Sequence, residues 1–346
     1  TSISPLFNYE CCTRAPPASE FTHDSGLSMN HITDPVPADL ETWEAIRDKI
    51  HNAAQHVMGP LPSGDRSGPP KWSVFDETDC GTYVRQSITY EADEGCETTA
   101  FICLPNDSSD EARPGVLCLH PTNGEQGYRD VVGLSGRVNR SYASELAEEG
   151  FVTISPSYPL MADYQPDIDA LGYESGTMKA IWDNIRALDL LESFSCVAGR
   201  AFGAIGHSLG GHNSVYTAVF DPRIEAVVSN CGLDSYLDYL NWTPGNGWSQ
   251  KRYMPRLVDY DSPAAIPFDF HDLIASLAPR GCLVSAPMGD SNFKWQSAAE
   301  VVRSAGEVYR LHGAADRLQI IHPQCPHDFP PDVRRVCYDF IGSVLR

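Results

Sequence analysis

Apolar residues change their spacing along the chain, and these changes predict where helices and strands lie. From Asp39 to about Met58 they recur every three or four positions, which is typical of an amphipathic helix. Short runs rich in β-branched and aromatic residues predict strands instead. In chain order, the eight runs of this kind are 83–90, 98–104, 115–120, 151–155, 201–207, 225–229, 281–286 and 317–321.

Helical patterns separate the later strands, and the alternation is typical of a mostly parallel sheet with helices on both faces. We therefore expect one large α/β domain over residues 71–346. Residues 1–70 are rich in Pro, Ser, Asp and Gly outside the predicted helix, so we expect an amino-terminal helical arm that packs on this domain. The later helices are predicted at about 138–149, at 176–192, after Gly210 and at 332–344.

An insertion follows the sixth strand, from about residue 232 to 278. It contains Trp242, Trp248 and several tyrosines among many Pro and Gly residues, so it cannot form one regular helix. Its place in the chain predicts a cap over the site. We expect Tyr158, Trp242 and Trp248 to bind substrate, although packing against the arm would explain the aromatic residues of the cap equally well.

The sequence Gly206-His207-Ser208-Leu209-Gly210 stands between a predicted strand and a predicted helix. A serine flanked by glycines in that setting is typical of the nucleophile elbow of an α/β-hydrolase, a turn too tight for side chains at the glycine positions. We predict that Ser208 is the nucleophile. Its hydroxyl group then needs a histidine to accept the proton and a carboxylate to orient that histidine.

The partners of Ser208 must follow strands, because active sites of open α/β sheets lie at the carboxyl ends of the strands. His327 follows the last strand and is the predicted base. Asp290 follows the seventh strand and is the predicted acid, with Asp234, after the sixth strand, as the alternative. Asp316 precedes the last strand, and about five residues at ~3.3 Å each would separate it from His327, so we exclude it.

Two backbone amides are expected to bind the oxyanion of the reaction intermediate. One belongs to Leu209, directly after the nucleophile. The other is expected from Thr122 in the loop after the third strand, because Pro121 has no amide hydrogen, and Asn123 is the alternative. His120 is expected to fix this loop rather than to act as a base.

Composition limits the partners. The 346 residues include 46 acidic and 25 basic side chains, and the formal net charge of −21 repels phosphate backbones and anionic membrane surfaces. No apolar stretch approaches the length of a membrane span. We therefore expect neither nucleic acid nor a membrane as partner, and the oligomeric state is not predicted.

Eleven cysteines include no Cys-x-x-Cys pair, so we expect no metal and no other cofactor. Cys103, Cys118 and Cys282 lie in apolar runs, where a thiol acts as a small apolar group. This usage favours a reducing, cytoplasmic compartment. The adjacent Cys11 and Cys12 leave secretion open.

From about residue 80 onward the chain resembles the α/β-hydrolase superfamily, in particular the branch of dienelactone hydrolases, acetyl xylan esterases and prolyl oligopeptidase-like enzymes. The strings that carry the resemblance lie at 116–122, 206–211, 286–290 and 327–330. The resemblance implies the α/β-hydrolase fold, with a mostly parallel eight-stranded sheet. The chain departs from the branch in three ways: Ser208 replaces the cysteine of dienelactone hydrolases, the 80 residues before the fold are too few to build the propeller of prolyl oligopeptidases, and His-Pro-Thr replaces His-Gly-Gly.

The resemblance also implies a serine hydrolase that cleaves a small-molecule carboxylic ester through an acyl-enzyme. The same catalytic groups would serve a peptidase, an amidase, a lactonase or a thioesterase. The fold also occurs in proteins that bind a ligand or catalyse a non-hydrolytic step, so this class stays open as well.

Overall fold

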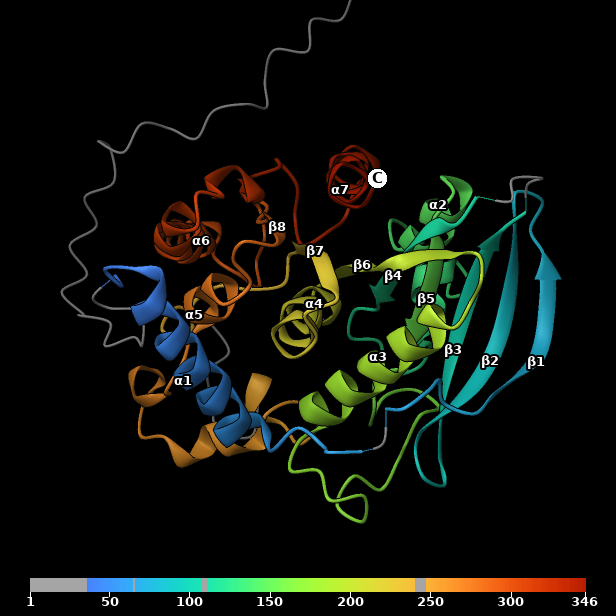
Figure 1. The fold of residues 1–346 in the computed structure, drawn as a ribbon, viewed down its shortest axis with the longest axis horizontal. Helices are drawn as coiled ribbons and strands as arrows, with labels where there is room; N and C mark the ends of the chain where they lie inside the picture. Colours follow the sequence, from blue (N-terminus) through green and yellow to red (C-terminus); the bar gives the residue numbers. More distant parts are fainter. Residues whose placement is uncertain (1–35, 65, 107–110, 240–246) are drawn as a thin grey trace, which may run out of the picture.

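A nine-stranded sheet crosses the molecule in the order β1-β2-β3-β5-β4-β6-β7-β8-β9 (Figure 1). The computed structural model describes residues 36–64, 66–106, 111–239 and 247–346. Pairs along this order are antiparallel from β1 to β5 and parallel from β5 to β9. The strands are β1 (Trp72–Asp79), β2 (Tyr83–Asp93), β3 (Cys96–Pro105), β4 (Arg113–Leu119), β5 (Val152–Pro156), β6 (Val197–His207), β7 (Ile224–Asn230), β8 (Gly281–Ser285) and β9 (Leu318–Ile321).

Helices cover both faces of the sheet, as the alternation predicted. One face carries α2 (Tyr142–Glu148) and α7 (Pro331–Leu345), and the opposite face carries α3 (Gly176–Glu192) and α4 (Leu209–Phe220) (Figure 1). The second layer continues with α5 (Phe270–Ala275) and α6 (Trp295–Leu311). A cluster of buried apolar side chains fills the space on each face, so the sheet separates two cores.

The sheet has one strand more than the eight we predicted from the sequence. The additional strand is β1, which pairs with β2 at the edge of the sheet. Nearly all of its residues are exposed, and three of the eight are acidic. It therefore lacks the alternation of buried and exposed positions by which a half-buried strand is recognised. Its pairing depends on backbone hydrogen bonds to β2.

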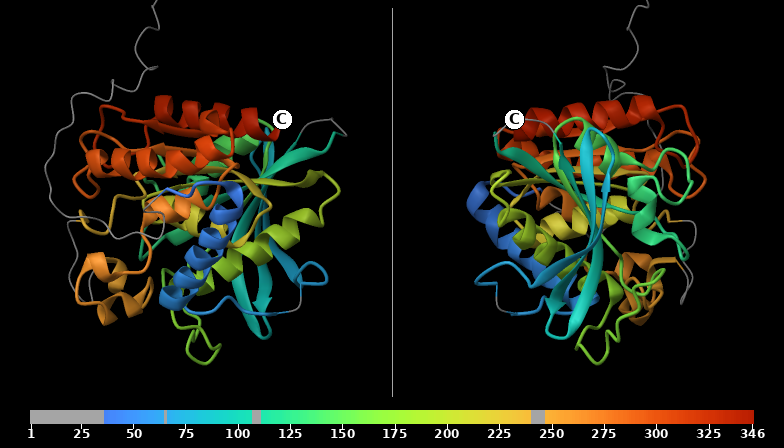
Figure 2. Two further views of the ribbon diagram at one scale, coloured as in Figure 1. Left: turned by 60° about the vertical axis from the view of Figure 1, so that its left-hand side comes forward. Right: turned by 90° about the vertical axis from the view of Figure 1, so that its right-hand side faces the viewer.

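Helix α1 (Leu40–Met58) lies in the predicted amino-terminal arm. The Asp39 carboxylate caps it by accepting a hydrogen bond of 2.7 Å from the backbone N–H of Thr42. Trp43 and Ile50 are fully buried in the core that α3 and α4 share. Figures 1 and 2 show α1 beside the short helix η3 (Pro255–Asp259) of the insertion. Residues 1–35 lie outside the described part, and the boundary near residue 70 stays a prediction.

The described residues of the insertion after β7 form short helical turns rather than one long helix. Its described part holds η2 (Gly247–Ser249), η3, η4 (Pro263–Ala265) and α5. Within the described ranges, no helix has both the length and the apolar composition needed to cross a membrane. The nine cysteines in these ranges are free thiols, and the compartment stays a prediction.

Candidate active site

The turn from β6 into α4 has the geometry of a nucleophile elbow. Ser208 has backbone angles φ 57° and ψ −119°, a conformation that residues other than glycine rarely adopt. A Cβ on Gly206 would lie 2.2 Å from the backbone of Gly210, and one on Gly210 would lie 1.9 Å from the carbonyl oxygen of Leu119. The glycines are therefore required by the close approach of backbone on both sides of the serine. The Ser208 side chain makes no capping hydrogen bond to the helix that it begins.

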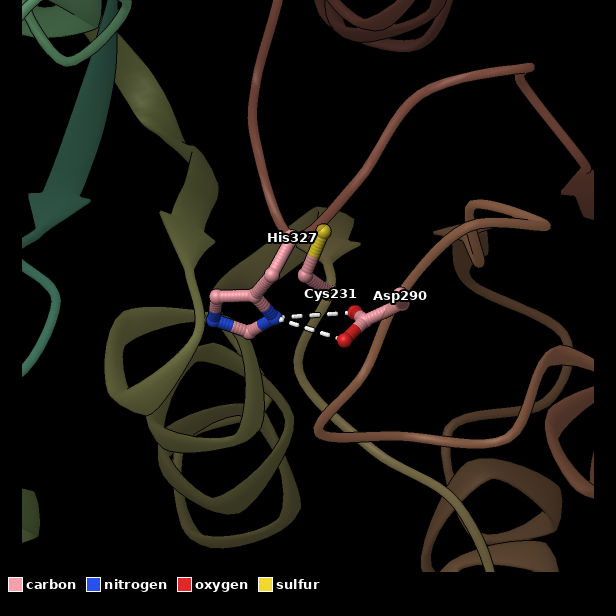
Figure 3. Close-up of side chains that lie close together, drawn as sticks. All are labelled: Cys231, Asp290 and His327. Carbon is pink, nitrogen blue, oxygen red and sulfur yellow. Dashed lines mark hydrogen bonds and ion pairs between the residues drawn. The ribbon is translucent and has the colours of Figure 1, made fainter.

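The loops after β8 and β9 run side by side, and this brings Asp290 and His327 together. Backbone hydrogen bonds join Ala286 to Ile321, Met288 to Pro323 and Gly289 to Cys325. At the end of this ladder, Nδ1 of His327 lies 2.8 Å and 3.0 Å from the two carboxylate oxygens of Asp290 (Figure 3). The predicted acid and the predicted base are thus in direct contact.

Hydrogen-bond donors keep the Asp290 carboxylate charged although its side chain is only 1% exposed. Burial raises its pKa, but the hydrogen bond and charge of His327 and the backbone N–H groups of Asn292 and Phe293 hold the pKa below its ordinary value. These N–H groups lie 2.7 and 3.2 Å from Oδ1. An ionised carboxylate only accepts, so Nδ1 of His327 carries the proton and Nε2 is the nitrogen that could act as a base.

The ring of His327 lies beside the nucleophile turn. Its centroid is 4.8 Å from that of His207, the residue directly before Ser208. In Figure 3 the ring nitrogen that does not face Asp290 points toward the turn between β6 and α4. The described structure contains no hydrogen bond between Ser208 and His327, and catalytic bonds are often long or absent without a substrate.

Cys231, which follows β7, also lies at this site, and the sequence analysis missed it. Its Sγ and the ligand atoms of Asp290 and His327 all lie within 4.8 Å of one another (Figure 3). Burial and the negative charge of Asp290 raise the pKa of the thiol well above its usual value, so it is a neutral S–H group. These residue types can bind metals, but here the aspartate and the histidine are already bonded to each other. The rule that partners follow strands would have singled out Cys231 too.

The loop after β4 borders the elbow, because its first carbonyls approach Gly210. His120 fixes this loop: Nδ1 lies 2.8 Å from the carbonyl oxygen of Pro121, and Nε2 accepts a hydrogen bond of 3.0 Å from the N–H of Tyr158. Burial lowers the pKa of His120 to about 4, so the ring is neutral at pH 7. Thr122 follows in this loop, and its hydroxyl lies 3.1 Å from that of Tyr253.

Three aromatic residues were expected to bind substrate. Tyr158 is buried with Leu209 and Tyr253 beside the elbow, and its hydroxyl donates to the carbonyl oxygen of Arg252 at 2.8 Å. Trp248 is buried too, with its ring centroid 5.7 Å from that of Phe293, which lies 6.0 Å from the ring of His327. Trp242 lies outside the described residues. Pocket roles for all three stay predictions.

Neither the rejected nor the alternative acid contacts His327 in the described structure. Asp316 is exposed in η5 (Ala315–Arg317), at the start of β9, whereas His327 follows the end of that strand. Asp234 is fully buried, but its carboxylate accepts from the backbone N–H of Lys294 at 2.9 Å. Of these three aspartates, only Asp290 contacts the histidine.

Comparison with known proteins agrees with this architecture. Residues 110–242 match the dienelactone hydrolase family. The chain has the α/β-hydrolase fold. The protein YtaP of Bacillus subtilis (strain 168) is 23% identical over 242 residues, which cover 67% of this chain and 79% of that protein. The predicted fold is thereby confirmed, and these matches agree with the resemblance stated from the sequence.

Solved structures of esterases share the fold of this chain. A glucuronoyl esterase from Solibacter usitatus superimposes with a TM-score of 0.73 at 18% identity, covering 92% of this chain and 98% of that one. A protein from Bacteroides fragilis described as an acetyl xylan esterase gives a TM-score of 0.59 at 16% identity, covering 85% and 78%. The predicted enzyme class, a carboxylic ester hydrolase, agrees with this family and these neighbours.

Proposed function

We propose that this α/β-hydrolase is a serine esterase that cleaves a small-molecule carboxylic ester through an acyl-enzyme. Ser208 Oγ attacks the ester carbonyl carbon while Nε2 of His327 takes the hydroxyl proton. Asp290 stabilises the imidazolium ion, which then protonates the departing alcohol. Water then attacks the acyl-enzyme while Nε2 of His327 takes a proton from it. The imidazolium ion returns this proton to Ser208 Oγ, which releases the acid and restores the hydroxyl group.

The observation that carries this proposal is the hydrogen-bonded pair of Asp290 and His327 beside a strained serine turn. Nδ1 of His327 bonds to the carboxylate at 2.8 Å, and the ring packs against His207, next to Ser208. We propose that the backbone N–H groups of Leu209 and Thr122 donate hydrogen bonds to the oxyanion. Leu209 begins α4, and Thr122 lies in the loop that borders Gly210.

For the substrate, we propose an ester of a carbohydrate or of a carbohydrate-derived acid. The names of the proteins from Solibacter usitatus and Bacteroides fragilis, glucuronoyl esterase and acetyl xylan esterase, refer to such substrates. Tyr158, Tyr253 and Trp248 are buried around the elbow, and we propose that they line the substrate pocket, because ligand pockets are lined mainly by apolar and aromatic side chains.

A fluorophosphonate probe tests the nucleophile, and p-nitrophenyl esters test the reaction. Wild-type protein should be labelled and should hydrolyse the esters, whereas Ser208→Ala should lose labelling and about 10⁵- to 10⁶-fold of kcat. Ser214→Ala is the matched control, since Ser214 lies in the same helix and donates to the carbonyl oxygen of Gly210. Wild-type protein that is folded but neither labelled nor active would refute the proposal.

A further inference from the structure

Asn230, the last residue of β7, contacts the two segments that carry the proposed nucleophile and base. Its carbonyl oxygen accepts a hydrogen bond of 2.9 Å from the backbone N–H of Ser208. Its side-chain Nδ2 lies 3.1 Å from the carbonyl oxygen of Asp328, the residue after His327. Asn230 is fully buried, so these contacts form without competition from water.

The orientation of the Asn230 amide follows from its partners. A backbone carbonyl only accepts, so the group that faces Asp328 is the NH₂. The same NH₂ lies 2.8 Å from Nδ1 of His207 and 3.4 Å from Sγ of Cys231. With two hydrogens, it can serve Asp328 and His207 at once. The amide oxygen has no hydrogen-bond partner in the described structure, which is costly for a buried group and marks a side chain placed for its donors.

His207 makes the second link between Asn230 and the base. Because its Nδ1 accepts from Asn230, the ring must be neutral, and burial together with the positive charge of Arg140 lowers its pKa well below the usual value. The neutral ring packs at 4.8 Å from the ring of His327. Asn230 thus supports the base through the loop backbone and through a neighbouring ring.

The other side of the histidine loop has its own attachment. The carboxylate of Asp328 accepts hydrogen bonds of 2.6 Å from both Asn139 and Arg140. These bonds hold the Asp328 side chain toward α2, while Asn230 and the thiol of Cys231 hold its carbonyl group toward β7. Asp328 is therefore fixed from opposite sides, and only the β7 side is linked to the nucleophile turn.

We propose that Asn230 is a positioning residue that sets the His327 loop against the Ser208 turn. This inference rests on the proposed function, because it assumes that the two residues exchange a proton. Nothing else in the described structure bonds both the Ser208 backbone and the backbone next to His327. Loss of the side-chain donors should change the distance between base and nucleophile while the substrate pocket keeps its shape. Misplacement by about 1 Å can cost about 10²-fold in rate.

The first test replaces the amide by an apolar side chain of similar size, Asn230→Leu. We expect kcat on p-nitrophenyl esters and the rate of fluorophosphonate labelling to fall about 10- to 100-fold, with KM changed less than threefold. Asn184→Leu is the matched control: Asn184 is equally buried, but its Nδ2 bonds Thr217 between α3 and α4. The control should keep kcat. Equal kcat values for Asn230→Leu, Asn184→Leu and wild type would overturn the inference.

A second variant guards against a folding defect in Asn230→Leu. Asn230→Asp keeps the shape but loses its donors when the carboxyl group ionises, while the protonated group still donates one hydrogen bond. Its kcat relative to wild type should therefore fall as the pH rises from 6 to 9, with unchanged circular dichroism. A ratio near one at every pH would overturn the inference. Wild-type protein without activity or labelling would instead refute the proposed function, so the two failures are distinguishable.

Discussion

Two buried aspartates follow neighbouring strands of the sheet, yet their surroundings give them opposite charge states. Asp290, after β8, accepts hydrogen bonds from two backbone N–H groups and from His327. Asp234, after β7, accepts one backbone N–H on Oδ2, and Oδ1 has no partner in the described structure. The pKa of Asp290 is lowered, whereas burial raises the pKa of Asp234 to about 8.

The difference shows that donors, rather than burial, decide which carboxylate can assist a histidine. Both side chains are almost completely removed from water. Only Asp290 has enough donors to remain ionised at pH 7, and only an ionised carboxylate can stabilise an imidazolium ion. Asp234 instead begins an insertion held together by aromatic packing, in which a neutral carboxyl group costs less than a charged one.

The largest effect is expected from Asp290→Asn. The amide would keep the shape of the side chain but would remove the charge and favour the wrong tautomer of His327. We expect kcat to fall about 10⁴-fold. Ester hydrolysis at saturating substrate measures this loss. Asp316→Asn, in an exposed turn before β9, is the control and should leave kcat unchanged.

If Asp290→Asn kept most of its activity while Asp234→Asn lost it, the assignment of the acid would be reversed. Such a result would require the Asp234 loop to rearrange, because its carboxyl group now accepts from the backbone N–H of Lys294 and does not contact His327.

The order of chemical groups along the chain could be predicted from the sequence, because it follows from the topology of the sheet. Ser208, Asp290 and His327 each follow a parallel strand, and the carboxyl ends of β6, β8 and β9 lie at one edge. The contact between Asp290 and His327 follows from that rule. The exclusion of Asp316 also needed only the length of a strand.

Features that depend on side-chain packing could not be predicted in this way. Asn230 looks like the end of an apolar strand in the sequence. The position of Cys231 after β7 could have been noticed, but the contacts of both residues with Asp328 arise only when the β9 loop folds over β7. The edge strand β1 was missed because it buries almost nothing. The aromatic residues of the insertion could not be divided between pocket and core, because the sequence does not show which side chains each ring packs against.

The aromatic packing of the insertion can be tested with Trp248→Ala. Trp248 is 3% exposed and stacks on Tyr239 at 4.0 Å between ring centroids. Its loss should lower the free energy of unfolding by about 3–5 kcal/mol, measured by urea denaturation. The control is Trp72→Ala in β1, where the side chain is 40% exposed and a much smaller change is expected. Equal changes for the two variants would mean that the insertion does not depend on this packing.

The smallest effect is expected from Asp234→Asn, and it depends on pH. The folded-state pKa of about 8 lies above the unfolded value of about 3.9, so this carboxyl group stabilises the wild type below pH 4 and that contribution is lost as the pH rises toward 8. The amide does not titrate. The variant should therefore gain about 2 kcal/mol of stability relative to wild type between pH 6 and pH 8, with a slope of about 1.4 kcal/mol per pH unit near pH 6 that falls as the pH approaches 8. Urea denaturation at both pH values measures this gain, and ester hydrolysis should stay within a few-fold of wild type.

A constant stability difference across this range would mean that Asp234 is already ionised in the folded protein, and the contrast with Asp290 would then disappear.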